Sequence, residues 1–431
     1  MGQNDGAQEA PSDRVNIGAI GVGGRGSGIG HQAGQLGNLV AVADVDANHA
    51  SRFAAKYQGR CEVYEDYRRL LEHKDIDAIT CGTPDHWHTK IAIDAMRAGK
   101  DVYCEKPLTL TIDESQQIMQ VTHETGRVFQ VGTQQRSEFD QRFLKAVVIA
   151  RSGRLGNKLH AISSVGPAGG KDNFRAGPYA TSKPPSHLNF DFWLGQAPLV
   201  EYCPERTHWN FRWWQEYSGG QIADWGVHHT DIALWALGGE QTGVATVEGH
   251  GTFPGLPYTK NVLDFLNGRI ELPNRYNVAK NFDCHMKLPN DNTINLVSKR
   301  NELIIEGNKG KIRVNRGGLS GKPVEEIAAS GKDSQWLKEE VAKLYRHMPF
   351  EKKHDGHLVH MSNFFHCIKT REMPISDVWT HCNTVNACHM ANIAMLLKRK
   401  VHFDFKQHHF TDDDQANQFL KRKQRPGYAI T

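Results

Sequence analysis

The sequence from residue 15 to residue 26 reads Val15-Asn16-Ile17-Gly18-Ala19-Ile20-Gly21-Val22-Gly23-Gly24-Arg25-Gly26. An apolar strand followed by this glycine-rich turn is typical of a dinucleotide-binding βαβ unit. In such a unit Gly21 permits the tight turn, Gly23 lets the backbone approach a pyrophosphate, and Gly26 lets the next helix pack on the strand. The unpaired N–H groups at the start of that helix attract phosphate groups. Asp44 ends the next apolar run about 20 residues further on, where a carboxylate accepts hydrogen bonds from an adenosine ribose.

The first third of the chain alternates short apolar runs with helical patterns. Apolar runs at residues 76–81, 101–104 and 128–131 are followed by glycine or charged residues, and Thr111 with Glu114 has the spacing of a helix capping box. This alternation predicts a doubly wound parallel sheet whose ligand crevice lies at the carboxyl ends of the strands. We therefore expect a disordered lead at residues 1–14 and a dinucleotide-binding domain at residues 15–137.

Beyond residue 138 the pattern changes to longer strand-like runs. They cover residues 158–165, 244–253, 276–288 and 303–313. They predict a second α/β domain at residues 138–431, with a large, mostly antiparallel open sheet. We expect a mobile loop at residues 167–185, a polar helical insertion at 323–353, and helices at 356–369 and 380–398.

Composition excludes several classes of protein. The chain has 431 residues, 39% of them hydrophobic and 23% charged, with a net charge of +4, which fits two or three globular domains. The basic residues form no stripe interleaved with aromatic residues, and no apolar run is long enough to span a bilayer, so we expect neither a nucleic-acid nor a membrane partner. The polar start lacks the apolar stretch of a signal peptide, which predicts a cytoplasmic protein. An exported protein whose signal has been removed stays open as an alternative. The eight cysteines form no CxxC pair, which predicts free thiols.

Glu105-Lys106-Pro107 ends a predicted central strand, at the edge where such sheets bind ligands. A lysine at this position would donate a hydrogen bond to a substrate hydroxyl and stabilise the developing alkoxide. A solvated lysine after a strand is the alternative, and the residues alone leave both open.

A second candidate group lies in residues 219–231. If the chain is helical from Gln221, Asp224 and His228 are four residues apart and share a helix face. A carboxylate beside an imidazole raises the pKa of the imidazole and orients it, which suits a general base. The alternative is a helix-start carboxylate with a buried core histidine. We predict no metal site from His86, His88, His228 and His229, because adjacent helical histidines point about 100° apart and no HExxH motif accompanies them.

Together these motifs resemble the Gfo/Idh/MocA oxidoreductase family over nearly all of residues 14–431. The resemblance extends to Thr83-Pro84 followed by His88, to residues 132–136 (Gly-Thr-Gln-Gln-Arg), and to a closing helix near residues 389–394. It implies an N-terminal Rossmann domain and a C-terminal α/β domain whose open sheet covers the active site and mediates oligomers. A homodimer or homotetramer is therefore expected.

The resemblance also implies roles for individual residues. The catalytic residues would be Lys106, Asp224 and His228, with His228 taking the hydroxyl proton, Asp224 orienting it and Lys106 polarising the oxygen. The cofactor would contact Gly21, Gly23, Arg25, Gly26, Asp44, Thr83, Pro84, His88, Glu105, Lys106 and Gln134. The substrate would contact Arg136, Arg212, Trp213 and His229. Asp44 and Asp46 would repel a 2′-phosphate, so we expect NAD rather than NADP.

The doubled His228-His229 and the aromatic run at residues 208–214 resemble a bacterial subgroup found beside glycan-degrading enzymes. Aromatic faces suit a pyranose, although an aromatic core cluster explains any single tryptophan equally well. Our leading hypothesis is an NAD(P)-dependent dehydrogenase acting on a carbinol of a sugar, cyclitol or sugar derivative. A glycosidase or lyase that retains NAD for transient sugar oxidation is one alternative, although several such family members lack the lysine present here as Lys106. A non-catalytic nucleotide-binding protein is the other, which the intact Lys106, Asp224 and His228 disfavour.

Overall fold

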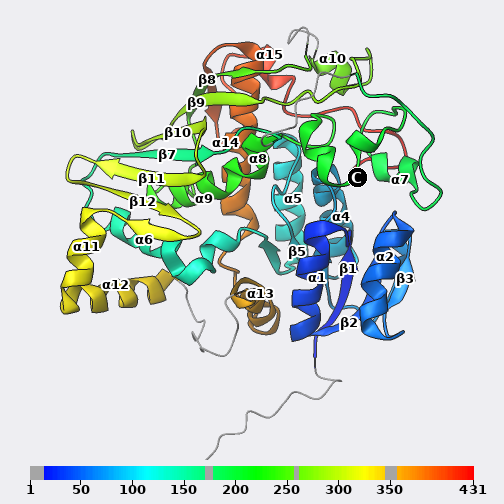
Figure 1. Cartoon of the computed structure of the whole chain (residues 1–431), viewed down its shortest axis with the longest axis horizontal. Coiled ribbons are helices and arrows are strands. Elements are labelled where there is room, and N and C mark those ends of the chain that lie inside the picture. The colour runs from blue at the N-terminus through cyan, green and yellow to red at the C-terminus, as the bar shows by residue number, and fades with distance from the viewer. Residues whose placement is uncertain (1–13, 170–177, 257–261, 345–356) are drawn as a thin grey trace, which may run out of the picture.

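The computed structural model describes residues 14–169, 178–256, 262–344 and 357–431. Most of the predicted lead at 1–14, part of the predicted mobile loop at 167–185 and the end of the predicted insertion at 323–353 lie outside these residues. The described chain contains two β-sheets, one in its first third and one beyond it (Figure 1). Among the described residues, none of the helices combines the length and apolar character needed to cross a membrane.

The first sheet is parallel and six-stranded, in the order β3-β2-β1-β4-β5-β6. Its strands are β1 (Asn16–Ile20), β2 (Asn38–Ala43), β3 (Glu62–Tyr64), β4 (Ala78–Cys81), β5 (Asp101–Cys104) and β6 (Phe129–Val131). The strand order reverses between β1 and β4, which opens a crevice at their carboxyl ends. The predicted doubly wound parallel sheet is confirmed.

Five helices connect these strands. They are α1 (Gly24–Leu36), α2 (Ala47–Ala54), α3 (Tyr67–Leu71), α4 (Asp85–Arg97) and α5 (Ile112–Thr125). The hydroxyl of Thr111 caps α5 by accepting a hydrogen bond from the N–H of Glu114 at 3.3 Å. The Glu114 carboxylate accepts the N–H of Leu110 at 2.7 Å, so only one half of the predicted capping box forms.

The second sheet has nine strands, in the order β13-β12-β11-β7-β10-β9-β8-β14-β15. They are β7 (Leu159–Val165), β8 (Thr246–Thr252), β9 (Asn281–Lys287), β10 (Thr293–Ser298), β11 (Glu302–Gly307), β12 (Gly310–Asn315), β13 (Gly318–Ser320), β14 (Val401–Asp404) and β15 (His409–Phe410). All neighbouring pairs are antiparallel except β7 and β10. The predicted mostly antiparallel sheet is confirmed, but the run at 303–313 is a hairpin of two strands. Strand β10 and the short strands β13, β14 and β15 were not predicted from the sequence pattern.

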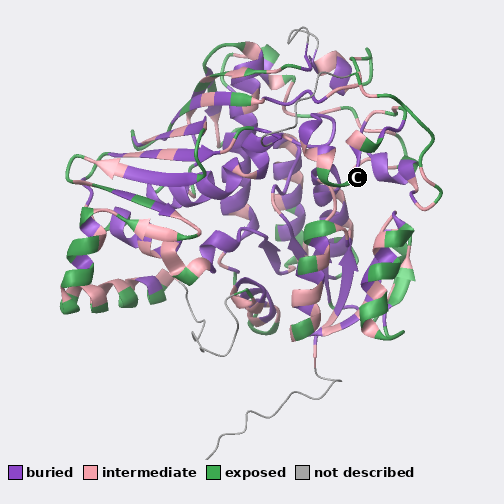
Figure 2. Cartoon of the chain, in the orientation of Figure 1, coloured by how far each residue is buried: buried purple, intermediate pink, exposed green. Residues whose placement is uncertain are grey.

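Helices of the C-terminal part serve both sheets. The remaining helices are α6 (Arg142–Arg151), α7 (Phe190–Leu194), α8 (Gln221–Asp224), α9 (Gly226–Ala236), α10 (Val262–Leu266), α11 (Lys322–Ala329), α12 (Gly331–Leu344), α13 (Val359–Thr370), α14 (Val378–Leu397) and α15 (Asp414–Asn417). Val378 and Cys382 of α14 join the core of the first sheet, whereas Val385 and Met390 join that of the second. This helix is buried along most of its length, whereas α11 and α12 are largely solvent-exposed (Figure 2). Because both cores share α14, the boundary at residues 137–138 stays a prediction.

All eight cysteines are buried, and no disulfide joins any two of them. They include Cys81 and Cys104, which face each other on β4 and β5.

Candidate active site

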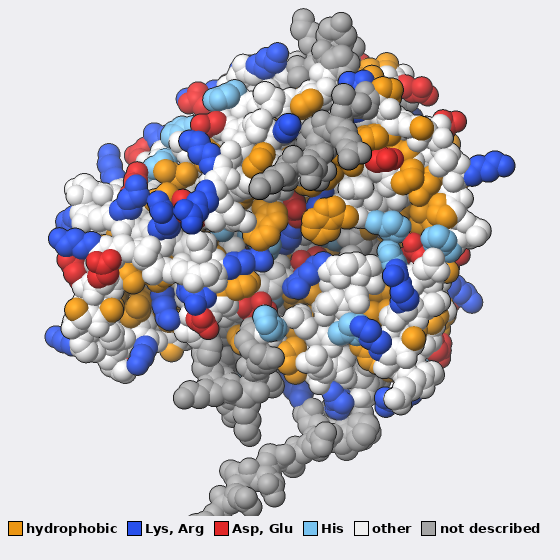
Figure 3. Space-filling model, viewed as in Figure 1, with side chains coloured by type: hydrophobic (Ala, Val, Ile, Leu, Met, Phe, Trp, Pro, Cys, Tyr) orange, Lys and Arg blue, Asp and Glu red, His pale blue; other side chains and the backbone are white. Residues whose placement is uncertain are grey.

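A cavity of about 340 Å³ lies at the carboxyl ends of the first-sheet strands. From the first sheet it is lined by residues that include Gly21, Gly23, Gly24, Arg25, Asp44, Asp46, His49, Thr83, Pro84, Asp85, His88, Glu105 and Lys106. From beyond the first sheet it is lined by Phe192, Trp193, His208, Trp209, Phe211 and Arg212. Charged side chains of both signs and hydrophobic side chains gather at the centre of the face seen in Figure 3. The cavity therefore has walls from both parts of the chain.

The glycine turn forms one end of the cavity and requires glycine for steric reasons. Gly21 has a φ of +71°, and a Cβ there would lie 2.5 Å from the side chain of Thr83. A Cβ on Gly26 would lie 1.8 Å from the carbonyl oxygen of Gly21, whereas a Cβ on Gly24 would meet nothing within 4 Å. The turn thus packs tightly against β4 and leaves open backbone at the start of α1. This shape fits the pyrophosphate of a dinucleotide.

Asp44 stands at the end of β2 and is held by the same turn. Its carboxylate accepts the N–H of Val22 at 2.8 Å and the N–H of Asp46 at 2.9 Å. The His49 imidazole lies 3.6 Å away, and hydrogen bonding to Asp44 raises the pKa of His49 against the opposing effect of burial. The carboxylate therefore remains at the cavity edge, where it is available to ribose hydroxyls.

Lys106 lies in the wall of the cavity and pairs with Asp224. Its ammonium donates to the Asp224 carboxylate at 2.5 Å and to the Asp224 carbonyl at 3.1 Å. The Arg212 guanidinium lies 3.4 Å from the other oxygen of the same carboxylate. Burial would raise the pKa of Asp224, but the charges of Lys106 and Arg212 outweigh it and lower that pKa. Asp224 is therefore an anion that holds two cations at the cavity.

His228 is buried near Lys106, but it does not pair with Asp224. The helix is interrupted at Trp225, between α8 and α9, and no hydrogen bond joins Asp224 to His228 in the part of the chain that is described. Burial and the charge of Lys106 lower the pKa of His228 well below its usual value. The prediction that Asp224 raises this pKa is wrong, because the carboxylate is already neutralised by two cations.

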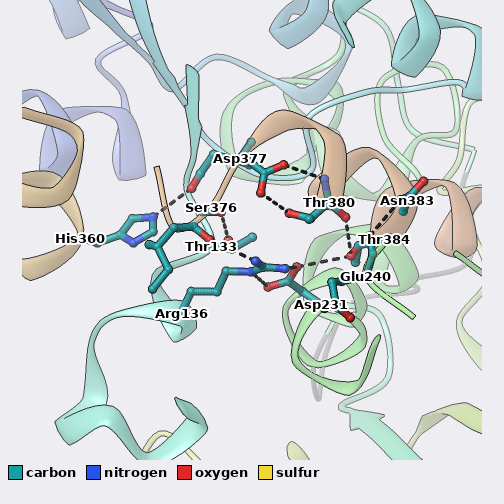
Figure 4. A network of polar contacts seen from close by, with 12 residues as sticks. Thr133, Arg136, Asp231, Glu240, His360, Ser376, Asp377, Thr380, Asn383 and Thr384 are labelled. Carbon is teal, nitrogen blue, oxygen red and sulfur yellow. Dashed lines mark hydrogen bonds and ion pairs between the residues drawn. The ribbon is translucent and has the colours of Figure 1, made fainter. Parts of the chain in front are cut away.

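Arg136 does not line the cavity, in contrast to its predicted substrate contact. Its guanidinium donates two hydrogen bonds of 2.7 Å to Asp231 of α9 and one of 3.0 Å to the carbonyl of Ile375 (Figure 4). Thr384 of α14 donates to the same carboxylate at 3.3 Å. The guanidinium of Arg136 is therefore neutralised in a buried ion pair, which joins the end of the first sheet to α9 and α14.

Four more of the predicted contact residues lie outside the cavity lining, as do the predicted catalytic residues Asp224 and His228. The first of the four is Gly26, which packs against the carbonyl of Gly21. Gln134 donates to Glu105 at 2.9 Å and to the hydroxyl of Tyr103 at 3.1 Å. The Nε2 atom of His229 lies 2.6 Å from the amide oxygen of Asn301. Trp213 packs in an aromatic core cluster. Their positions suit support of the site from behind, and Gln134 fixes the Glu105 carboxylate that also pairs with Arg25 at 2.9 Å.

His88 lies between two loops of the cavity wall. Its Nδ1 atom is 2.7 Å from the carbonyl of Pro107, and its Nε2 atom is 2.9 Å from the carbonyl of Thr83. The Nε2 atom of His86 lies 3.0 Å from the carbonyl of Trp193. His86 and His88 therefore contact different backbone carbonyls. His86, His88, His228 and His229 therefore do not form one ligand group.

Sequence reasoning missed several residues of the cavity. Asp85 is buried beside Thr83-Pro84, and burial raises its pKa to about 7. Its Oδ2 atom has no hydrogen-bond partner among the described residues. Trp209 and Phe211 line the cavity where the sequence analysis selected Trp213. The position of Asp85 directly after Thr83-Pro84 was the available signal, whereas nothing local distinguishes the three aromatic residues.

Comparisons with known proteins agree with this architecture. Residues 15–133 match a family model described as "Oxidoreductase family, NAD-binding Rossmann fold". Residues 151–252 and 331–430 match one described as "Oxidoreductase family, C-terminal alpha/beta domain". Together the two models cover most of the chain.

Curated relatives are similar at modest identity. The uncharacterized oxidoreductase YrbE of Bacillus subtilis is 28% identical over 206 residues, and this match spans 48% of each chain, about half of that relative's length. The scyllo-inositol 2-dehydrogenase (NAD(+)) of the same organism is 25% identical over 78% of this chain and 80% of its own. The WlbA dehydrogenase of Bordetella pertussis, solved with NADH and UDP-GlcNAcA, superposes with a TM-score of 0.63 at 15% identity, over 91% of this chain and 99% of WlbA. This structural likeness concerns the fold.

Proposed function

The chain belongs to the Gfo/Idh/MocA oxidoreductase family, and from this premise we propose that it transfers hydride between NAD and a carbinol carbon of a sugar, cyclitol or sugar derivative. The observation that carries the proposal is Lys106, an ammonium held against Asp224 in the wall of the cavity beside the glycine turn. A lysine in this setting can donate to an alcohol oxygen as negative charge develops on it.

The residues present fit the cofactor. The backbone of Gly23 and the open backbone of Gly24 would hold the pyrophosphate, and Asp44 would accept the ribose hydroxyls. The carboxylates of Asp44 and Asp46 favour NAD over NADP, because a 2′-phosphate would lie against negative charge. Bound NAD supplies a nicotinamide ring that accepts or returns a hydride.

The protein side of the reaction follows from the charges around Lys106. Lys106 would donate a hydrogen bond to the substrate oxygen, while Asp224, which is also paired with Arg212, keeps the Lys106 ammonium in place. His228 is uncharged at neutral pH because its pKa is lowered, so its imidazole can accept the hydroxyl proton. Trp209 and Phe211 provide aromatic faces beside Arg212 for the apolar face of a sugar ring.

The test is NADH absorbance with excess NAD, catalytic amounts of the full chain, and a panel of inositols, aldoses and glycosides. Continued growth of the signal far beyond the protein concentration with one class would support the proposal and identify that class. Absence of turnover with every member, despite NAD binding, would refute it.

A second candidate function is a glycosidase or lyase reaction in which the cofactor stays bound throughout. Contacts near the cavity support it. Backbone hydrogen bonds of 2.9 Å from Ala47 to His187 and from Asn189 to Val45 attach the segment before α7 to the end of β2. Arg425, close to the end of the chain, pairs with Asp191 of α7 at 2.6 Å. These contacts attach the segment that carries the cavity residues Phe192 and Trp193 to the strand that ends beside Asp44, which would slow the release of a dinucleotide. Glycoside cleavage without net NADH, or a signal of one equivalent, would favour this reading.

A further inference from the structure

Imidazole and carboxylate side chains from distant parts of the chain meet at the edge of the cavity. Asp46 and His49 belong to the start of α2, whereas His187 precedes α7 and His208 begins the 3₁₀ helix His208–Trp213. The ligand atoms of Asp46, His49 and His208 all lie within 4.8 Å of one another. Asp46, His49 and His208 also line the cofactor cavity, and the proposed function uses Asp46 to disfavour NADP, but it gives His187 and His208 no role.

The separation of Asp46 from His208 is that of two ligands of one metal ion rather than that of a hydrogen bond. The Oδ2 atom of Asp46 lies 3.4 Å from Nε2 of His208 and 3.8 Å from Nε2 of His187. Hydrogen bonds to nitrogen span about 2.7–3.2 Å. Two ligands of a tetrahedral zinc ion, each about 2.0–2.1 Å from the metal, are about 3.4 Å apart.

The remaining contacts hold these atoms in place. The Oδ1 atom of Asp46 caps α2 by accepting the N–H groups of Asn48 and His49, which leaves Oδ2 facing the histidines. His187 is fixed by its own backbone, because its carbonyl accepts the N–H of Ala47 at 2.9 Å. Within the described ranges, no hydrogen bond engages Oδ2 of Asp46 or the rings of His187 and His208.

His49 is placed as a further ligand. Its ring meets that of His208 edge-on, with centroids 4.8 Å apart, and its Nδ1 atom lies 3.6 Å from Asp44. A carboxylate behind the far ring nitrogen is the arrangement that orients metal-binding imidazoles. Imidazole with carboxylate suits zinc and similar divalent transition metals, and not magnesium or calcium, which prefer oxygen ligands alone.

We propose that Asp46, His49 and His208 bind one divalent transition-metal ion of the zinc class, with His187, whose Nε2 atom lies 3.8 Å from Asp46, as the fourth ligand. The ion would join the start of α2 to the 3₁₀ helix that carries Arg212, and so hold this helix over the cavity. The site would be structural, and because three of its ligands also line the cofactor cavity, zinc binding and NAD binding are measured separately.

The test uses the full chain after dialysis against a chelator, titrated calorimetrically with Zn²⁺, and with Co²⁺ while visible absorbance is recorded. We expect one equivalent of zinc at submicromolar affinity and the intense absorbance of tetrahedral cobalt. His208→Gln and His187→Gln should each weaken binding at least about tenfold. The control His250→Gln, at an exposed position of β8, should leave it unchanged.

Lack of stoichiometric zinc binding in the wild type would overturn the proposal, as would equal affinity in all three variants. NAD affinity is measured in the metal-free proteins as well. If His208→Gln and His187→Gln weaken NAD binding there and leave zinc binding unchanged, these histidines serve the cofactor and the metal site is rejected. Far-ultraviolet circular dichroism verifies that each variant is folded.

Discussion

Replacing Lys106 by methionine tests the centre of the proposed site. The change keeps most of the side-chain stem and removes the ammonium that donates to Asp224 at 2.5 and 3.1 Å. A donor aimed at a developing oxyanion in a buried site contributes about 3–4 kcal/mol to the transition state. We therefore expect kcat to fall by roughly 10²- to 10³-fold. The pKa of Asp224 should rise in the variant, because Lys106 is the larger of the two charges that lower it.

The assay combines two measurements on the same protein. Turnover is followed as NADH absorbance with the best substrate of the panel, and NAD affinity is followed by quenching of tryptophan fluorescence, since Trp193 and Trp209 line the cavity. The dissociation constant for NAD should change little, because the glycine turn and Asp44 are untouched. Lys90→Met is the matched control, since Lys90 forms an ion pair of 3.0 Å with Asp94 on α4 and does not line the cavity.

Unchanged turnover in Lys106→Met would refute the catalytic assignment. A loss of NAD affinity as large as the loss of turnover would show that Lys106 serves cofactor binding. Equal losses in Lys90→Met would attribute the effect to folding rather than to the site.

Three further predictions concern packing and protonation. Gly26→Ala should lower the melting temperature and weaken NAD binding, because its Cβ would lie 1.8 Å from a carbonyl oxygen, and overpacking costs about 1–3 kcal/mol. Gly24→Ala is the control for stability, and equal melting temperatures would contradict the argument. The stability of Asp85→Asn relative to the wild type should be higher at pH 8 than at pH 4. The raised pKa of Asp85, about 7, means that the folded chain loses stability as the pH rises from 3.8 through 7, and asparagine does not ionise. An equal gain at both pH values would be inconsistent with a raised pKa. The melting temperature should fall steeply below pH 6.5, because several buried histidines have their pKa lowered to about 3 or 4. Below pH 6.5 the unfolded chain therefore binds more protons than the folded chain. Each such histidine lowers the free energy of unfolding by about 1.4 kcal/mol per pH unit. The histidines concerned are His86, His229, His360, His381 and His389. A melting temperature that stays constant from pH 7 to pH 5 would refute this prediction.

The sequence by itself determined the elements whose causes are local. The positive φ of Gly21 and the contact of Gly26 with the turn are demands of the backbone, and they appear as glycines at fixed spacing. Parallel strands buried on both faces appear as short apolar runs, so the first sheet and its crevice follow from residues 15–131. Lys106 was found because its position at a strand end places it at the ligand edge of such a sheet.

Strand number in the second sheet was harder to predict. The hairpin of β11 and β12 appeared as one run, because the sequence shows apolar periodicity but not where a strand reverses. The short strands β13 and β15 have few residues from which any period can be read. Their pairing is decided by neighbours that come from elsewhere in the chain.

Only the tertiary structure decided the fate of individual polar side chains. Arginine is usually exposed, and Arg136 was predicted to contact the substrate. It instead forms a buried ion pair with Asp231, which is 95 residues away in the sequence. Asp224 and His228 have the spacing of a pair, but Lys106 and Arg212 arrive from other segments and neutralise the carboxylate first. The histidines around Asp46 show no motif, since 141 and 162 residues separate it from His187 and His208. A side chain's charge and burial depend on the partners that the fold brings to it, and those partners are not encoded in its own neighbourhood of the sequence.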